Sequence, residues 1–510
     1  MKYIKIVFFI FLTLTYTACT KLDEKFRSDV VNASNLTATQ LLTSAYNSLN
    51  TVQTGDWWHL QEHTSDELIG PTRGPDWDDN GNWRALHLHT WTADQSQVNG
   101  AFSALLTGQY NASVVLQPEF KATTQQAAEA RFIRAFTIFA VLDSYDQVPY
   151  REDLNDFKKL PVTMKSTEAA DFVITELNAI ISDLPDGPNY IANKDAAKVL
   201  LMKVYLNKAV YANRSTPSFD NGDMQQVITL ADQIINSGKY SIGAKDYFNN
   251  FAPDNDIISK ENIFTLLNQP GGTLGGNVRG TWFQIAHYNM NPGGWNGFAT
   301  LSDFYNKFDA TDERRGIDYR YVGALPNPAH EPNVGFFVGQ RYDETTGAAL
   351  KDRQGAPLVF TPEVSIIETG PDLERTGIRV NKYPYDYATN NDQKNNDWAV
   401  FRYADVLLMK AEAILRSGGS EAEARNIVNS IRTARGVANF STLTLANLLD
   451  ERGRELYWEG WRRQDLIRFG KYLELWQEKP SDDPRNLIFP IPNNQLAVNP
   501  NLVQNPGYEQ

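Results

Sequence analysis

Two histidines near the N-terminus have the spacing of a metal site. His59-Leu60-Gln61-Glu62-His63 has the form H-x-x-E-H, in which a helix presents two imidazoles one turn apart and a glutamate as general base. A catalytic zinc site needs a third ligand, and His87 and His89 could complete a four-histidine cluster. Gly55 and Gly70-Pro71, however, leave room only for a short helix. Two interpretations therefore stay open: a zinc-dependent hydrolase, or histidines that serve only as polar or core residues. We favour the second, and we predict no bound metal, no cofactor and no catalytic residue.

A short acidic run has the spacing of a calcium loop. Asp76-x-Asp78-x-Asn80-Gly81 copies the opening of an EF-hand loop, where alternate oxygen ligands surround the ion and the glycine permits the turn. The twelfth position, which should hold a bidentate glutamate, is His87. This departure favours a turn with solvated acids over a differently completed calcium site.

Tryptophans in glycine-rich and proline-rich segments could bind a ligand by stacking. Of the 11 tryptophans, Trp77 and Trp83 lie in one such segment, and Trp282 and Trp295 in another. A flat indole beside Asp, Asn and Arg suits a sugar, whose C–H face is apolar and whose hydroxyls need donors and acceptors. The alternative for each ring is that it plugs the base of its loop. Seven others are assigned to packing: Trp57, Trp58, Trp91, Trp398, Trp458, Trp461 and Trp476.

Composition excludes several classes of protein. The 510 residues include 48 basic and 61 acidic side chains, for a net charge of −13, and no dense cationic block, so nucleic acid is not an expected partner. The sequence contains no G-x-S-x-G, P-loop or G-x-G-x-x-G motif. A carboxylate pair for glycosidic cleavage cannot be singled out among 61 acids, so a secreted hydrolase of that kind stays an alternative.

The single cysteine follows a secretory signal. Lys2 and Lys5 precede the apolar run from Ile6 to Leu14, which is too short to span a bilayer, and Ala18 stands directly before Cys19. This order is that of a bacterial lipoprotein signal, in which the cysteine is lipidated. We predict a signal peptide over residues 1–18 and a lipidated tether over 19–36. An ordinary cleaved signal with an idle cysteine is the alternative.

Helical periodicity dominates the rest of the chain. Apolar residues recur at i, i+3, i+4 and i+7 in many stretches, which predicts amphipathic helices joined in antiparallel pairs. The fold expected is mostly α, with tetratricopeptide-like helical hairpins at about 121–240 and 400–476, although the strict tetratricopeptide consensus is absent. Between about 243 and 396, glycine, proline and asparagine replace this pattern, as in Asn291-Pro292-Gly293-Gly294-Trp295. We predict a large loop-rich insert there that faces the ligand.

Several separate segments resemble one family along nearly the whole chain. The sequence is similar to the SusD/RagB family of outer-membrane glycan-binding lipoproteins. The segments that carry the resemblance are Ser65-Asp66-Glu67, Pro71–Trp77, Leu86–Trp91, Ala128–Phe136, Val148-Pro149-Tyr150, Phe401–Ala413, Glu451–Leu466, Pro490-Ile491-Pro492 and Asn499–Tyr508.

The resemblance implies a function as well as a fold. It implies one SusD-like domain over 37–510, a glycan site on irregular loops, and a SusC-like TonB-dependent transporter as partner. It also implies that the lipid anchor holds the protein at the outer membrane, exposed at the cell surface. Because aromatic ligand residues vary within the family, the candidates come from the loop composition above. The predicted glycan-binding residues are Trp77, Trp83, Arg73, Asp66, Asn82, Trp282, Tyr288 and Trp295.

Overall fold

A computed structural model describes most of the chain. The residues described are 36–151, 153–154, 156, 158–269, 278–319, 333–344, 346–389 and 394–508. The predicted signal peptide and nearly all of the tether, Cys19 included, lie outside them. The chain divides into two compact units, Met1–Thr37 and Ala38–Gln510. Within the described part of the chain, no helix is both long and apolar enough to cross a membrane.

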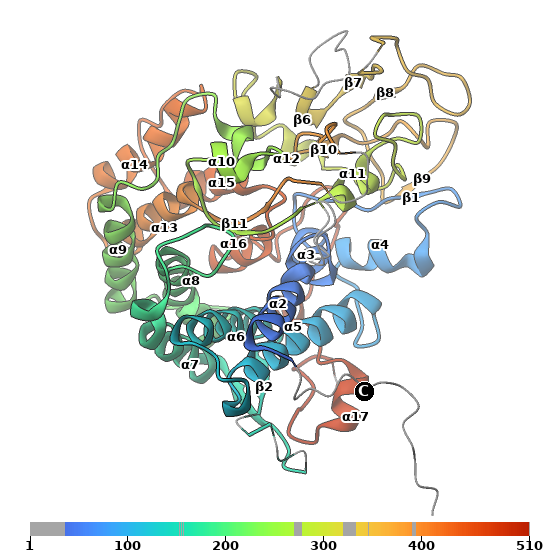
Figure 1. The fold of residues 1–510 in the computed structure, drawn as a ribbon. Helices are drawn as coiled ribbons and strands as arrows, with labels where there is room; N and C mark the ends of the chain where they lie inside the picture. The colour runs from blue at the N-terminus through green and yellow to red at the C-terminus, as the bar shows by residue number, and fades with distance from the viewer. Residues whose placement is uncertain are drawn as a thin grey trace, which may run out of the picture. The chain divides into compact units, whose positions relative to one another are not determined.

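Stacked antiparallel helices form the frame of the second unit, as predicted. Helices α5 to α9 each pack against the next in sequence, and α13 packs on α9 and α14 (Figure 1). The bounds of these helices are α5 Ser96–Val115, α6 Thr124–Tyr145, α7 Ser166–Ile180, α8 Lys194–Ala212, α9 Asn221–Asn236, α13 Tyr403–Arg416 and α14 Glu421–Ala434. Side-chain caps fix several of their first turns, including a capping box in which Thr123 and Gln126 bond each other's backbone N–H groups.

The remaining helices are shorter or lie at the ends of this frame. They are α2 Ala38–Asn47, α3 Asp56–Glu62, α4 Asn82–His87, α10 Asn255–Ile258, α11 Arg279–Ile285, α12 Ser302–Tyr305, α15 Leu445–Leu456, α16 Arg462–Arg468 and α17 Asn493–Val498. Helix α2 packs against α5, and α3 also packs against α5. These contacts seat the N-terminal segment on the helical frame.

Most of the short strands lie in the insert, which also contains the short helices α10, α11 and α12. The strands are β1 Thr72–Arg73, β2 Gln147–Tyr150, β3 Val162–Lys165, β4 Asn262–Leu266, β5 Gly316–Asp318, β6 Asn333–Phe337, β7 Gly339–Gln340, β8 Val359–Phe360, β9 Ile367–Glu368, β10 Arg379–Asn381 and β11 Trp398–Arg402. The largest sheet among the described residues has the order β10-β6-β5. Strand β1 pairs in parallel with β9, so Thr72 lies opposite Ile367 and Arg73 opposite Glu368. This pairing joins the N-terminal tryptophan loop to the insert, about 300 residues later in the chain.

Helix α15 carries buried glutamates that join the helical frame to the insert. Glu455 forms ion pairs with Arg314, Arg402 and Arg435, with distances of 3.1, 3.0 and 2.9 Å between the guanidinium nitrogen and the carboxylate oxygen. All four side chains are fully buried. Burial alone would raise the pKa of Glu455, but the three guanidinium groups hold it well below its usual range. The motif Glu451–Leu466 thus has a structural role, because its charges connect β11, α14 and the insert.

Six of the seven tryptophans assigned to packing are buried, which confirms that prediction for them. Their side chains are 0 to 3% exposed: Trp57, Trp58, Trp91, Trp398, Trp458 and Trp461. Trp476 is only half-buried.

Candidate functional site

Three predicted tryptophans lie together at the surface. The ring centroid of Trp77 is 6.2 Å from that of Trp83 and 6.4 Å from that of Trp295. Trp295 is 54% exposed, and its other face stacks on Phe283 at 5.0 Å with an interplanar angle of 9°. Trp77 and Trp83 are half-buried. We call Trp77, Trp83, Phe283 and Trp295 the aromatic surface.

Hydrogen bonds fix the orientation of two of these rings. The indole N–H of Trp77 donates to the carbonyl oxygen of Trp295 at 2.8 Å, and that of Trp83 donates to Asp79 Oδ2 at 2.6 Å. The loop that carries Trp77 turns tightly, with positive φ angles at Trp77, Asp79 and Asn80. Such angles are uncommon for residues other than glycine and mark a tightly constrained loop. The rings are therefore held in place before any ligand arrives.

Gly297 allows Trp77 to lie against the backbone. A Cβ atom at this position would be 2.3 Å from Cε2 and Cζ2 of Trp77 and 2.9 Å from the carbonyl oxygen of Gln284. We expect Gly297→Ala to displace the indole and to weaken ligand binding about tenfold, a loss of about 1.4 kcal/mol. Isothermal titration would measure the affinity. Gly187→Ala is the matched control, since a Cβ there meets nothing within 4 Å. An unchanged affinity for Gly297→Ala would contradict this role of Trp77.

A polar cluster lies beside the aromatic surface. Tyr288 donates its hydroxyl to Asp76 Oδ2 at 2.9 Å, and the guanidinium of Arg353 lies 3.8 Å over the Tyr288 ring. Arg353 also pairs with Glu374, which is bonded to His287 Nε2 at 2.8 Å. Burial would raise the pKa of Glu374, but the hydrogen bonds from Arg353 and His287 lower it to about 2. Hydroxyl, carboxylate and guanidinium groups next to exposed indoles match the two faces of a sugar ring.

Trp282 and Arg73 are placed differently from the prediction. Trp282 is 1% exposed and donates its indole N–H to the carbonyl oxygen of Tyr383 at 2.9 Å, so it has no free face for a ligand. Arg73 is 3% exposed and donates to the carbonyl oxygens of Gly297, Leu373 and Thr376. Arg73 therefore ties β1 to the insert and positions the aromatic surface, while its own donors are already used.

The other two predicted polar residues, Asp66 and Asn82, lie in different surroundings from each other. Asp66 accepts a bidentate pair from Arg462, at 2.6 and 2.7 Å, and lines a different pocket, described below. Burial would raise its pKa, but Arg462 keeps it below the usual value. Asn82 is half-buried at the start of α4, directly before Trp83. Of the eight predicted residues, the structure gathers Trp77, Trp83, Trp295, Tyr288 and Asn82 in one region.

The H-x-x-E-H histidines lie beneath the aromatic surface. His59 and His63 are buried, and the His63 ring stacks on Trp83 with centroids 4.8 Å apart. Burial lowers the pKa of His59 to about 3 and that of His63 well below its usual value, so both stay neutral. The described residues contain no group of three or more His, Cys, Asp or Glu side chains that could hold a metal ion. The burial of both rings and the stacking of His63 on Trp83 support the packing interpretation of these histidines.

The acids of the calcium-like run have protein partners. Asp76 bonds Tyr288 and Arg353, Asp78 pairs with Arg84 at 2.7 Å, and Asp79 accepts from Trp83. This arrangement supports the prediction of a turn. It also shows why Asp76 and Asp79 belong to the site, since they orient its aromatic rings.

Sequence reasoning missed Phe283, Arg353 and Glu374. Phe283 follows Trp282 on α11, and successive helical residues point about 100° apart, so burial of Trp282 turns Phe283 outward. Arg353 and Glu374 lie in irregular segments whose contacts depend on the tertiary fold. Of these three residues, only Phe283 could have been found from the sequence, because it stands directly after the candidate Trp282.

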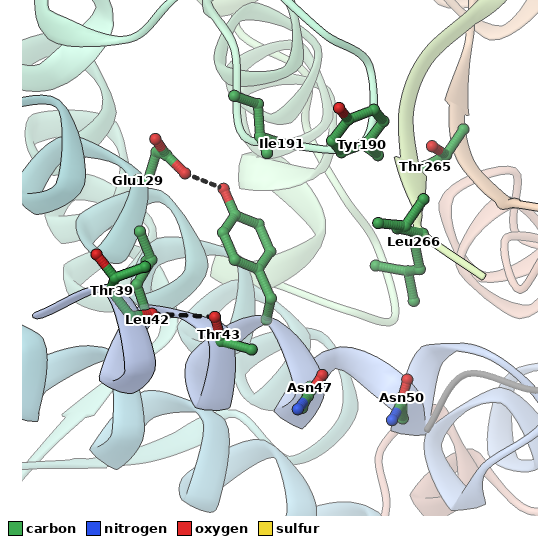
Figure 2. Close-up of a pocket in the computed structure, with 12 residues that line it drawn as sticks. Thr39, Leu42, Thr43, Asn47, Asn50, Glu129, Tyr190, Ile191, Thr265 and Leu266 are labelled. Carbon is green, nitrogen blue, oxygen red and sulfur yellow. Dashed lines mark hydrogen bonds between the residues drawn. The ribbon is translucent and has the colours of Figure 1, made fainter. Parts of the chain in front are cut away.

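A separate pocket of about 240 Å³ lies between α2, α6, the segment before α8 and the end of β4 (Figure 2). Threonines and asparagines of the N-terminal helices form one wall, and Tyr190, Ile191 and Leu266 face them. Inside, the Tyr46 hydroxyl donates to Glu129 Oε2 at 2.6 Å. The pocket shares no lining residue with the aromatic surface.

Comparisons with known proteins agree on one family. A model of the SusD family matches residues 230–482. The chain is 28% identical to the starch-binding protein SusD of Bacteroides thetaiotaomicron, over 76% of this chain and 73% of that protein. It is 25% identical to SusD-like protein P2 of Formosa agariphila over the full length of both. The solved structure of surface glycan-binding protein A from Bacteroides thetaiotaomicron with laminarihexaose has 18% identity and a TM-score of 0.68, covering 92% of this chain and 98% of that one, so it shares the fold. From the motifs, the helical frame and these matches, the chain belongs to the SusD family.

Proposed function

We propose that the protein binds an oligosaccharide or polysaccharide on the aromatic surface without cleaving it. The observation that carries the proposal is the meeting of Trp77, Trp83 and Trp295 at the surface, beside the cluster of Asp76, Tyr288 and Arg353. The indoles take the apolar face of a sugar ring, and the polar cluster bonds its hydroxyls. The starch-binding relative and the laminarihexaose complex of a protein with the same fold support this ligand class.

The binding protein acts at the outer membrane in this proposal. Lipidated Cys19 anchors it there, with the folded unit exposed at the cell surface. A SusC-like TonB-dependent transporter receives the bound glycan and takes it up. The support for anchor and partner is the lipoprotein signal in the sequence and membership of the SusD family.

A glycan panel tests binding and cleavage in one experiment. The purified protein is titrated with α-1,4-, β-1,3- and β-1,4-linked glucose oligomers and with a uronic acid oligomer, while tryptophan fluorescence is recorded. We expect saturable quenching by at least one oligomer and no new reducing ends after prolonged incubation. Release of reducing ends would favour the hydrolase alternative, and lack of binding to every member, at concentrations up to millimolar, would contradict glycan capture.

A further inference from the structure

We propose that the protein has a second saccharide site, in a pocket between α12, α15, α16 and residues 471–476. The pocket measures about 320 Å³ and shares no lining residue with the aromatic surface. Its volume reaches the lower end of the roughly 300–1,000 Å³ range of small-molecule sites. The pocket of Figure 2, at about 240 Å³, is smaller than that range. The choice of a saccharide as ligand class rests on the proposed function.

The floor of this second pocket is apolar and partly aromatic. Leu301, Phe304, Leu449, Leu466 and Trp476 line it. Trp476 is the half-buried tryptophan noted above, and the ammonium group of Lys479 lies 3.5 Å from the centroid of its ring. Leu475, also in the lining, is 65% exposed. The indole ring and the aliphatic groups together offer an apolar face to a sugar.

The charged side chains of the pocket are mostly paired. Arg462 pairs with Asp66, Lys307 with Asp450 at 2.8 Å, and Lys471 with Glu474. Because these charges neutralise one another, they attract an ion weakly, while their carboxylate and ammonium groups can still bond hydroxyls. Asp303 adds an exposed carboxylate that has no ion pair within the described part of the chain. The chemistry therefore suits an uncharged polyhydroxylated ligand, and it gives Asp66 a place in this pocket.

A blocking variant separates the second site from the first. Ala446 is exposed in the first turn of α15 and lines the pocket, so Ala446→Trp fills the space without touching the core. The background is the double variant Trp77→Ala with Trp295→Ala, which removes two of the four rings of the aromatic surface, including the most exposed one. Ala422→Trp, at an exposed position of α14, is the matched control for an added indole.

Titration calorimetry with laminarihexaose and maltoheptaose gives the readout. We expect two binding events in the unmodified protein, one weaker event in the double variant, and at least a tenfold further loss when Ala446→Trp is added, but no loss with Ala422→Trp. The second site is overturned if the double variant binds neither oligomer, or if Ala446→Trp leaves its affinity unchanged. If the unmodified protein binds no glycan at all, the proposed function fails as well. Failure of the second site alone is recognised because the unmodified protein still binds glycan.

Discussion

Trp295→Ala is expected to weaken glycan binding more than any other single change at the aromatic surface. Trp295 is 54% exposed, and one face of its ring stacks on Phe283, so the alanine variant removes the most accessible stacking face and leaves the core untouched. Aromatic residues at the centre of a binding surface typically contribute about 2 kcal/mol or more, which corresponds to roughly 30-fold in Kd. Titration with the best oligomer of the panel measures the change.

The control for this variant is another exposed aromatic residue. Tyr110 is 47% exposed on α5 and belongs to neither the aromatic surface nor the polar cluster beside it. Tyr110→Ala should therefore bind glycan as the unmodified protein does. Equal affinities for Trp295→Ala and Tyr110→Ala would mean that the ligand lies elsewhere.

Glu455→Gln is expected to destabilise the fold by about 3 to 5 kcal/mol. The substitution keeps the shape of the side chain but removes the negative charge that faces Arg314, Arg402 and Arg435, all fully buried. Breaking a buried ion pair leaves uncompensated charge in a medium of low polarity, and its cost is of this size. Urea unfolding followed by circular dichroism measures the free energy of unfolding.

A surface glutamate provides the comparison. Glu474 pairs with Lys471, but its side chain is 59% exposed, and such pairs contribute about 0 to 1 kcal/mol. Glu474→Gln should leave the unfolding free energy nearly unchanged. Glu261 also pairs with Arg402 and Arg435, and Glu451 with Arg314. A Glu455→Gln protein as stable as Glu474→Gln would show that these two glutamates suffice to neutralise the three arginines.

Periodicity predicted the helical frame because burial on a helix repeats every three to four residues. The stripe Phe132, Ala135, Phe136 and Phe139 lies on α6 with exposures of 0 to 1%. The hydropathy pattern does not reveal which charged side chains are buried. The motif Glu451–Leu466 looks like a polar surface helix, yet α15 buries its acids by pairing them with arginines that lie far away in the sequence.

The candidate site was predicted only in part, for a different reason. Loop composition located Trp77 and Trp295, because turn-rich segments lie at the surface. Trp83 differs from that expectation, since it lies in the first turn of the short helix α4 and stacks on the buried His63. The same argument failed for Trp282, which the short helix α11 directs into the interior. The prediction for Arg73 was wrong for another reason. A loop arginine can donate its hydrogen bonds to the backbone of a distant segment, as Arg73 does to Leu373, instead of to a ligand.

The bond between the Trp77 indole and the carbonyl of Trp295 spans 218 residues of sequence. Contacts of such separation carry a large entropic cost of loop closure, which the rest of the folded chain must offset. No fragment that ends before Trp295 can assemble the stacking face, whatever helices it contains. Glycan binding at the aromatic surface therefore requires the complete folded chain, and a chain truncated before Trp295 would not bind there.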